Sequence, residues 1–316
     1  MAHVPVLLDR VTELALPALQ HEGAVLVDGT LGLGGHAAAI LAAAPQAHLV
    51  GIDRDEQALA EAERRLAPFA GRITLVHAVA ADLEEVLERT DHASVSAVLL
   101  DLGVSSLQLD AVERGFSYAR DAPLDMRMDQ RRGRTASEVV NSYSVGELAR
   151  VLRVYGEERF ARRIAQAIDR ERQREPFTGT ERLAEVVRTA VPAATRRTGG
   201  HPAKRTFQAL RIEVNAELDG LAMTLPAALA ALQEHGRLLV LAYHSLEDRL
   251  VKQAMAAQAH PDVPPGLPIV PDHLQPTLRL LTRGAERASA AELEANPRAA
   301  SVRLRAAERI RRQEAA

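Results

Sequence analysis

Cysteine and tryptophan are both absent from this chain of 316 residues, and aromatic residues make up only 3% of it. Without cysteine the chain can form no disulfide bond, thiolate metal site or cysteine nucleophile. Long apolar runs are also missing, since no stretch approaches the roughly 18 residues that a membrane span needs. The N-terminus lacks the basic and apolar regions of a signal peptide. These absences predict a protein of the cytoplasm with no membrane segment.

Hydrophobic residues make up 47% of the chain, which is enough for one large domain and an addition to it. Up to about residue 110, apolar runs that indicate strands alternate with segments that indicate helices. The expected strands are residues 25–28, 49–52, 73–77 and 95–101, and the expected helices are 36–44, 55–67 and 82–90. This alternation is typical of an α/β fold with a doubly wound parallel sheet.

The alternation stops in the middle of the chain and resumes later. Capping boxes that begin at Thr135, Ser144 and Thr178 predict helices in the middle, and no strand is expected there. Further on we expect a helix over 215–234, a strand over 237–242 and final strands at 277–281 and 301–305. The sequence therefore predicts a discontinuous sheet domain, residues 1–110 and 212–316, with an inserted helical domain, residues 111–211.

The net charge of −3 is unevenly distributed. Residues 1–110 hold 6 basic and 16 acidic side chains, whereas residues 111–211 hold 21 basic and 13 acidic ones. A basic insert favours a polyanionic substrate, because clustered basic side chains attract phosphates. A single arginine can equally belong to a solvated helix face. We expect phosphate contact from two clusters, which contain Arg131, Arg132, Arg134, Arg196, Arg197, Lys204 and Arg205.

A glycine-rich turn follows the first expected strand. Asp28 ends that strand, Gly34 and Gly35 lie in the turn, and the second strand ends at Asp53. A plain strand-to-helix turn would use the same glycines, but an acid at the end of the second strand is placed to bind the hydroxyls of a ribose. Asp28 would repel a pyrophosphate and suits ammonium and sulfonium groups. The pattern therefore favours S-adenosylmethionine over a dinucleotide.

Asp101 ends the fourth expected strand. At that position it would lie beside the sulfonium group of the donor, or else it would only cap the following turn.

These motifs resemble the RsmH (MraW) family of methyltransferases, which modify the exocyclic N4 amine of a cytosine in 16S ribosomal RNA. The longest matching segment runs from Leu100 to Asp110. Others cover residues 3–9, 28–36, 53–55, 114–118, 123–129, 155–160, 206–212, 244–249 and 296–298. The resemblance implies a Rossmann-like class I sheet that uses S-adenosylmethionine, and an inserted domain that recognises RNA.

By this resemblance, Gly34, Gly35 and His36 contact the methionine part of the donor, and Asp53 binds its ribose. Family members often carry an aromatic residue where this chain has Ala80, so adenine is expected to rest on aliphatic groups instead. Together with Asp28, the expected donor site comprises Asp28, Gly34, Gly35, His36, Asp53, Ala80, Asp101 and Gln108.

The expected chemistry is attack of the cytosine amine on the donor's methyl group. The amine is a poor nucleophile because its lone pair is delocalised into the ring, so an acceptor should bind its N–H as the bond forms. Asp101 is the leading candidate, with a backbone carbonyl as the alternative. Methylation at carbon 5 ordinarily needs a thiolate, so the lack of cysteine agrees with transfer to nitrogen.

Two more residues are candidate substrate contacts. His244 follows a late strand, where it either binds the target base or a phosphate, or is buried and bonded to backbone. Asn215 either faces the cleft or caps the helix that it opens, and its position favours the cap. No group of histidine and acidic residues has metal-binding spacing, so no metal is expected. The sequence does not separate a monomer from a homodimer.

Two other functions remain open at this point. The chain could methylate a protein or a small molecule, or it could be a non-catalytic RNA-binding factor for ribosome assembly. The basic insert argues against the first, and the retained Asp28, Gly34, Asp53 and Asp101 argue against the second.

Overall fold

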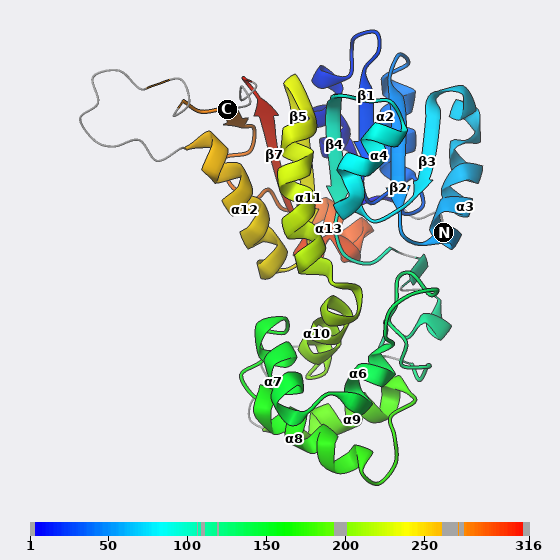
Figure 1. Cartoon of the computed structure of the whole chain (residues 1–316), viewed down its shortest axis with the longest axis vertical. Coiled ribbons are helices and arrows are strands. Elements are labelled where there is room, and N and C mark those ends of the chain that lie inside the picture. The colour runs from blue at the N-terminus through cyan, green and yellow to red at the C-terminus, as the bar shows by residue number, and fades with distance from the viewer. Residues whose placement is uncertain are drawn as a thin grey trace. The chain divides into compact units, whose positions relative to one another are not determined.

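The computed structural model describes residues 4–105, 107–108, 111–118, 120–192, 201–260, 271 and 275–311. The chain divides into two compact units (Figure 1). Unit 1 contains the chain up to Gly103 and from Asp219 onward, and unit 2 is Val104–Leu218. Arg196 and Arg197 lie outside the described residues.

Unit 1 is built on a seven-stranded mixed sheet of the predicted Rossmann-like α/β class, with the order β3-β2-β1-β4-β5-β7-β6. The first five strands are parallel, and β7 is antiparallel to its neighbours β5 and β6. The strands are β1 Val25–Asp28, β2 His48–Asp53, β3 Ile73–His77, β4 Val95–Asp101, β5 Leu232–Ala242, β6 Leu278–Leu280 and β7 Arg303–Arg309.

Helices cover both faces of this sheet because its central strands are apolar on both sides. Along β1, Val25 and Val27 belong to one apolar cluster and Leu26 belongs to another. The first cluster includes side chains of α4 (Leu83–Arg89), α11 (Glu217–Ala231) and α12 (Ser245–Ala259). The second includes side chains of α1 (Leu8–Ala15), α2 (Gly35–Ala43) and α3 (Glu56–Leu66), and α13 (Ala290–Ala295) completes the described helices of unit 1. Fully buried strands of this kind are typical of parallel sheets.

Unit 2 is helical and has an apolar core of its own. Its described helices are α6 Ala136–Ser142, α7 Val145–Val154, α8 Ala161–Arg172, α9 Thr180–Ala190 and α10 Lys204–Asn215. Leu152, Ile164 and Phe177 are fully buried in that core. Among the residues that the structure describes, no helix in either unit is long and apolar enough to cross a membrane.

Two of the three predicted capping boxes are confirmed. Thr135 and Ser144 each accept a backbone N–H and are bonded in return by a glutamate three residues on. The box at Thr178 is wrong, because α9 begins at Thr180 after Gly179. There the backbone N–H of Glu181 donates to the carboxylate of Asp121 instead.

The helix predicted over 215–234 is confirmed as α11, with the narrower bounds Glu217–Ala231. Ala216 has a left-handed backbone, with φ 48°, which ends α10 at Asn215 and separates it from α11. At the other end, β5 begins at Leu232, earlier than the strand predicted from 237. The last strand lies at Arg303–Arg309, a little beyond the predicted 301–305.

Candidate active site

Three aspartates stand at the carboxyl ends of neighbouring strands in unit 1. Asp28 ends β1, Asp53 ends β2 and Asp101 ends β4, and β1 lies between the other two strands. In open α/β sheets this edge is where ligands bind. The sheet therefore gathers three of the predicted site residues from positions far apart in the sequence.

The glycine-rich turn between β1 and α2 is bonded to both neighbouring strands. The backbone N–H of Gly29 donates to the carbonyl of Leu99 on β4, and that of Leu31 donates to the carbonyl of Ile52 on β2, each at 2.9 Å. Gly34 has φ +71° and precedes the first residue of α2, and a Cβ on Gly35 would lie 2.4 Å from the ring of Pro5. Glycine is needed at both places, one for its conformation and one for lack of space.

Asp28 is 2% exposed, and burial raises its pKa to about 8. The neighbouring charges of Asp101 and Asp53 raise the pKa further, and a hydrogen bond from the Thr30 N–H opposes them. Desolvation and like charges both disfavour an ionised carboxyl. This edge of the sheet is thus suited to a positively charged ligand.

The carboxylate of Asp53 binds the backbone of the glycine-rich turn. Its two carboxylate oxygens accept the N–H of Gly32 at 2.7 Å and the N–H of Asp55 at 2.8 Å. Burial raises the pKa of Asp53 despite these two bonds. A carboxylate oxygen has more than one acceptor position, so the same group can still accept a hydroxyl.

Asp101 is fixed by three residues of unit 1. Its backbone N–H donates to the Thr30 hydroxyl at 2.6 Å, and its Oδ1 accepts the Tyr243 hydroxyl at 2.7 Å. Its Oδ2 lies 3.6 Å from Nδ1 of His36. Burial, followed by the Asp101 carboxylate, raises the pKa of Tyr243, so the phenol stays a proton donor.

Tyr243 was not predicted from the sequence as a site residue. It directly follows β5, which pairs with β4 in register up to Asp101 and Leu241. Two parallel neighbouring strands end at the same edge, and that rule was the available signal. The separation of 142 positions in the sequence hid their proximity.

The segment from Tyr243 to Glu247 is held by contacts of the buried Glu247. Its Oε2 accepts the backbone N–H of Tyr243 at 2.7 Å and that of His244 at 3.2 Å. His244 caps α12 by accepting the N–H of Glu247, and its Nε2 lies 3.1 Å from Glu247 Oε1. These contacts correspond to the structural alternative for His244, and its contact with substrate stays a prediction.

Three more residues were predicted to contact the methyl donor, namely Ala80, His36 and Gln108. Ala80 begins a short 3₁₀ turn after β3 and lies 3.6 Å from a Cβ built on Gly29, so this loop borders the glycine-rich turn. His36 is buried and its Nε2 bonds the carbonyl of Val6 at 2.9 Å. Gln108 belongs to unit 2, where its side chain accepts the N–H of Ser105. Donor contacts of Ala80, His36 and Gln108 stay predictions.

The basic residues of unit 2 differ in their contacts with the rest of the protein. Arg131 pairs with Asp129 at 3.3 Å, and Arg134 lies over the ring of Tyr143. Arg205 donates to the carbonyl of Glu157 and remains exposed. Arg132 and Lys204 are exposed too. These side chains lie on the surface, as an interface with phosphates requires.

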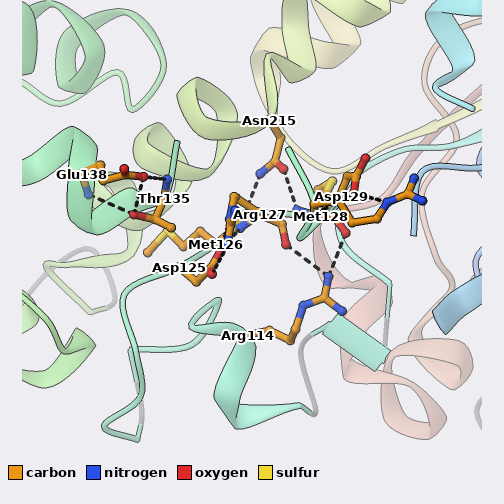
Figure 2. Close-up of polar contacts among 10 residues, drawn as sticks. Arg114, Asp125, Met126, Arg127, Met128, Asp129, Thr135, Glu138 and Asn215 are labelled. Atoms are coloured by element: carbon orange, nitrogen blue, oxygen red, sulfur yellow. Dashed lines mark hydrogen bonds and ion pairs between the residues drawn. The ribbon is translucent and has the colours of Figure 1, made fainter. Parts of the chain in front are cut away.

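Asn215 corrects a prediction, because it ends α10 and opens no helix. Its side chain is 9% exposed, accepts the N–H of Met128 and donates to the carbonyls of Met126 and Arg211. Figure 2 shows Asn215 and the buried Arg114 directed at the same segment. Arg114 donates to the carbonyls of Arg127 and Met128. Asn215 therefore holds the 126–128 backbone, and a role toward substrate stays a prediction.

Among the described residues, no group of three or more histidine and acidic side chains could hold a metal ion.

A sequence model of the MraW methylase family matches residues 1–310. The chain belongs to this family. Proteins named ribosomal RNA small subunit methyltransferase H are close relatives of it. The one from Parafrankia sp. (strain EAN1pec) is 60% identical over 309 residues, which are 98% of this chain and 94% of the relative. The one from Salinispora arenicola is 64% identical, over 98% of this chain and 83% of the relative, and that from Thermobifida fusca is 60% identical, over 98% and 94%.

Proposed function

We propose that this MraW family member transfers a methyl group from S-adenosylmethionine to the exocyclic N4 amine of a cytidine in the 16S ribosomal RNA of the small subunit. The names of its relatives support an RNA of the small ribosomal subunit as substrate. The observation that carries the proposal is Asp101 at the end of β4, fixed by Thr30 and Tyr243 beside the glycine-rich turn. Such an enzyme acts in the cytoplasm, as a monomer or a homodimer.

The acids at the sheet edge fit this donor. Bound there, S-adenosylmethionine supplies a methyl group that is activated by the positive charge on sulfur. Asp28 is buried between Asp53 and Asp101, and a cation in that position favours the ionised form of each carboxyl. Asp53 binds the ribose hydroxyls, and the backbone at Gly34, Gly35 and His36 holds the methionine part. Ala80 borders the adenine, and the family resemblance also implies a donor contact for Gln108.

Asp101 acts on the target amine. A carboxylate that accepts an N–H of the amine raises electron density on nitrogen as the new bond forms. The Thr30 hydroxyl fixes the backbone of Asp101, and the Tyr243 hydroxyl orients its carboxylate. This matters because catalytic groups act best when they are positioned in advance. No covalent intermediate with the protein is needed, in keeping with a chain that lacks cysteine.

Unit 2 supplies the contacts with RNA. Its basic side chains include Arg131, Arg132 and Arg134 before α6, and Lys204 and Arg205 in the first turn of α10. Phosphate contacts of this kind position an RNA without reading its sequence. Arg196, Arg197, His244 and Asn215 remain further candidates for substrate contact.

The proposal is tested by transfer of labelled methyl groups from S-adenosylmethionine to small ribosomal subunits, followed by nucleoside analysis. Label in N4-methylcytidine is expected with the wild type, and the Asp101→Asn variant should be slower by about a hundredfold or more. The matched control is Asp91→Asn, an exposed aspartate with φ 60°, a conformation that asparagine adopts readily. Label in protein, in another nucleoside or nowhere would contradict the proposal.

A further inference from the structure

We propose that His36 receives, through Asp101, the proton that the target amine loses during methyl transfer. This inference rests on the proposed function and adds a second group to its chemistry. It gives His36 a part beyond the donor contact that the family resemblance implies.

The tautomer of His36 follows from the hydrogen bond of its Nε2. Nε2 lies 2.9 Å from the carbonyl oxygen of Val6, and a carbonyl can only accept. Nε2 therefore carries a proton, and a neutral imidazole has one N–H only. Nδ1 of the neutral ring is left with a lone pair, which faces Oδ2 of Asp101 at 3.6 Å.

Two acceptors thus face each other, and one proton between them would bond both. His36 is 5% exposed, and the Asp101 side chain is partly exposed. Asp28, on the strand next to β4, lies near Asp101, and Tyr243 after β5 donates its hydroxyl to Oδ1 of Asp101. Glu247 and Glu292 add negative charge near Tyr243.

The reaction supplies one proton. The amine nitrogen starts with two hydrogens and ends with one hydrogen and one methyl group. Its lone pair forms the bond to carbon, and the electron pair of the broken carbon–sulfur bond stays on sulfur. The departing proton passes to Oδ2 of Asp101 and on to Nδ1 of His36. The imidazolium that results donates through Nδ1 to Asp101 and through Nε2 to Val6.

Tyr243 decides which oxygen takes part. Its hydroxyl donates to Oδ1 of Asp101 at 2.7 Å, and this leaves Oδ2 as the oxygen on the His36 side. Because the phenol remains protonated, it orients the carboxylate and takes no proton itself. Tyr243 is therefore a positioning residue in this scheme.

The first test needs no donor and no RNA. In ¹⁵N-labelled protein, long-range ¹H–¹⁵N spectra distinguish a protonated from an unprotonated imidazole nitrogen, and the signal lost in His36→Gln assigns the ring. We expect neutral His36 to carry its proton on Nε2. A neutral ring with the proton on Nδ1 would overturn the proposal, because that ring could not accept a proton from Asp101.

The second test is the pH dependence of single-turnover methyl transfer at saturating donor. His36→Gln should lower the plateau rate by about ten- to a hundredfold. It should also shift the acidic limb of the pH–rate profile to lower pH by about one unit or more. The reason is that a carboxyl group alone would then accept the proton, and ordinary carboxyl groups have pKa values about two units below those of imidazoles. The matched control is His235→Gln. His235 lies 3.8 Å from a carboxylate, Glu308, but is exposed and precedes the carboxyl end of β5. This control should leave rate and limb unchanged.

Tyr243→Phe keeps the proposal testable if His36→Gln fails to fold. Loss of the Tyr243 hydrogen bond makes Asp101 more basic, so the acidic limb should move up by about half a unit or more. An unchanged limb in Tyr243→Phe would overturn the proposal. A His36→Gln variant with wild-type plateau and limb but weaker donor binding would also overturn it, leaving His36 as a donor contact only. Failure of the proposed function is distinguishable, because the wild type would then methylate no small subunit.

Discussion

The two units treat charge in opposite ways. Unit 1 places the acids Asp28 and Asp53 under the surface at one edge of its sheet, where burial raises the pKa of both. Unit 2 keeps most of its basic residues on the surface, among them Arg132, Lys204 and Arg205. A buried charge costs free energy unless something compensates for it, whereas an exposed one costs little. Each buried acid of unit 1 is therefore evidence for a ligand by itself. An exposed arginine of unit 2 is evidence for a ligand only as one of a cluster.

Buried polar groups in the two units differ in how they are satisfied. In unit 2, Arg114 donates to backbone carbonyls, and Asn215 both donates to and accepts from backbone groups. In unit 1, burial and then the nearby charges of Asp101 and Asp53 raise the pKa of Asp28. The backbone bonds of Arg114 and Asn215 stabilise the fold of unit 2. The clustered carboxyls of unit 1 form a site that is suited to a cationic ligand.

The largest effect that sharpens this contrast is expected from Asp53→Ala. It removes the acceptor of two backbone N–H groups at the glycine-rich turn as well as the proposed ribose contact. Donor affinity measured by calorimetry should fall by about a hundredfold, while affinity for a small-subunit RNA fragment should change less than about twofold. Glu63→Ala, at an exposed position of α3, is the control. Loss of RNA affinity with donor binding intact would break the contrast.

Asn215→Ala should destabilise unit 2 and spare the donor site. Three hydrogen bonds of a buried side chain are lost, which costs about 2–3 kcal/mol in the free energy of unfolding. Urea denaturation measures this loss, with Gln166→Ala on the exposed face of α8 as the control. Unchanged stability would show that Asn215 is not the structural support inferred here.

Asp28→Asn should stabilise the free protein and weaken donor binding. The folded-state pKa of Asp28, about 8, is above the ordinary value of 3.8. The contribution of this carboxyl to stability is therefore fully present below about pH 4 and is lost as the pH rises through about 8. The amide does not ionise, so the melting temperature of the variant should exceed that of the wild type by about 3 °C at pH 8.5 and by less at pH 5.

The same variant should bind the donor about tenfold more weakly, because a cationic ligand favours a carboxylate over an amide. A stability gain that is equal at both pH values would mean that Asp28 is ionised throughout. Donor affinity equal to that of the wild type would remove Asp28 from the site.

The smallest effect is expected from Arg205→Ala. Loss of one phosphate contact should weaken RNA binding a few-fold and reduce the slope of log affinity against log salt by about 0.7. Arg188→Ala, which removes an exposed arginine paired with Glu185, is matched in charge and should leave the slope unchanged. Equal effects of the two variants would mean that only net charge matters.

The sequence was sufficient wherever the signal was local. Apolar runs predicted β1, β3 and β4 with their observed bounds, and the boxes at Thr135 and Ser144 marked two helix starts. Errors arose where a distant residue decided the structure. Asp121 takes the place of Thr178 at the start of α9, and Tyr243 reaches Asp101 from another strand. Local patterns carry no information about such partners.

The most direct test of the division between the units is a parallel measurement of salt dependence on one protein sample. Affinities for S-adenosylmethionine and for a small-subunit RNA fragment are measured between low and high salt. The account predicts a steep fall for RNA, with a slope of about −2 or steeper from several phosphate contacts, and a nearly flat line for the donor, whose partners are buried. A flat line for RNA would contradict the proposed RNA interface of unit 2, and a steep one for the donor would contradict the buried acidic site of unit 1.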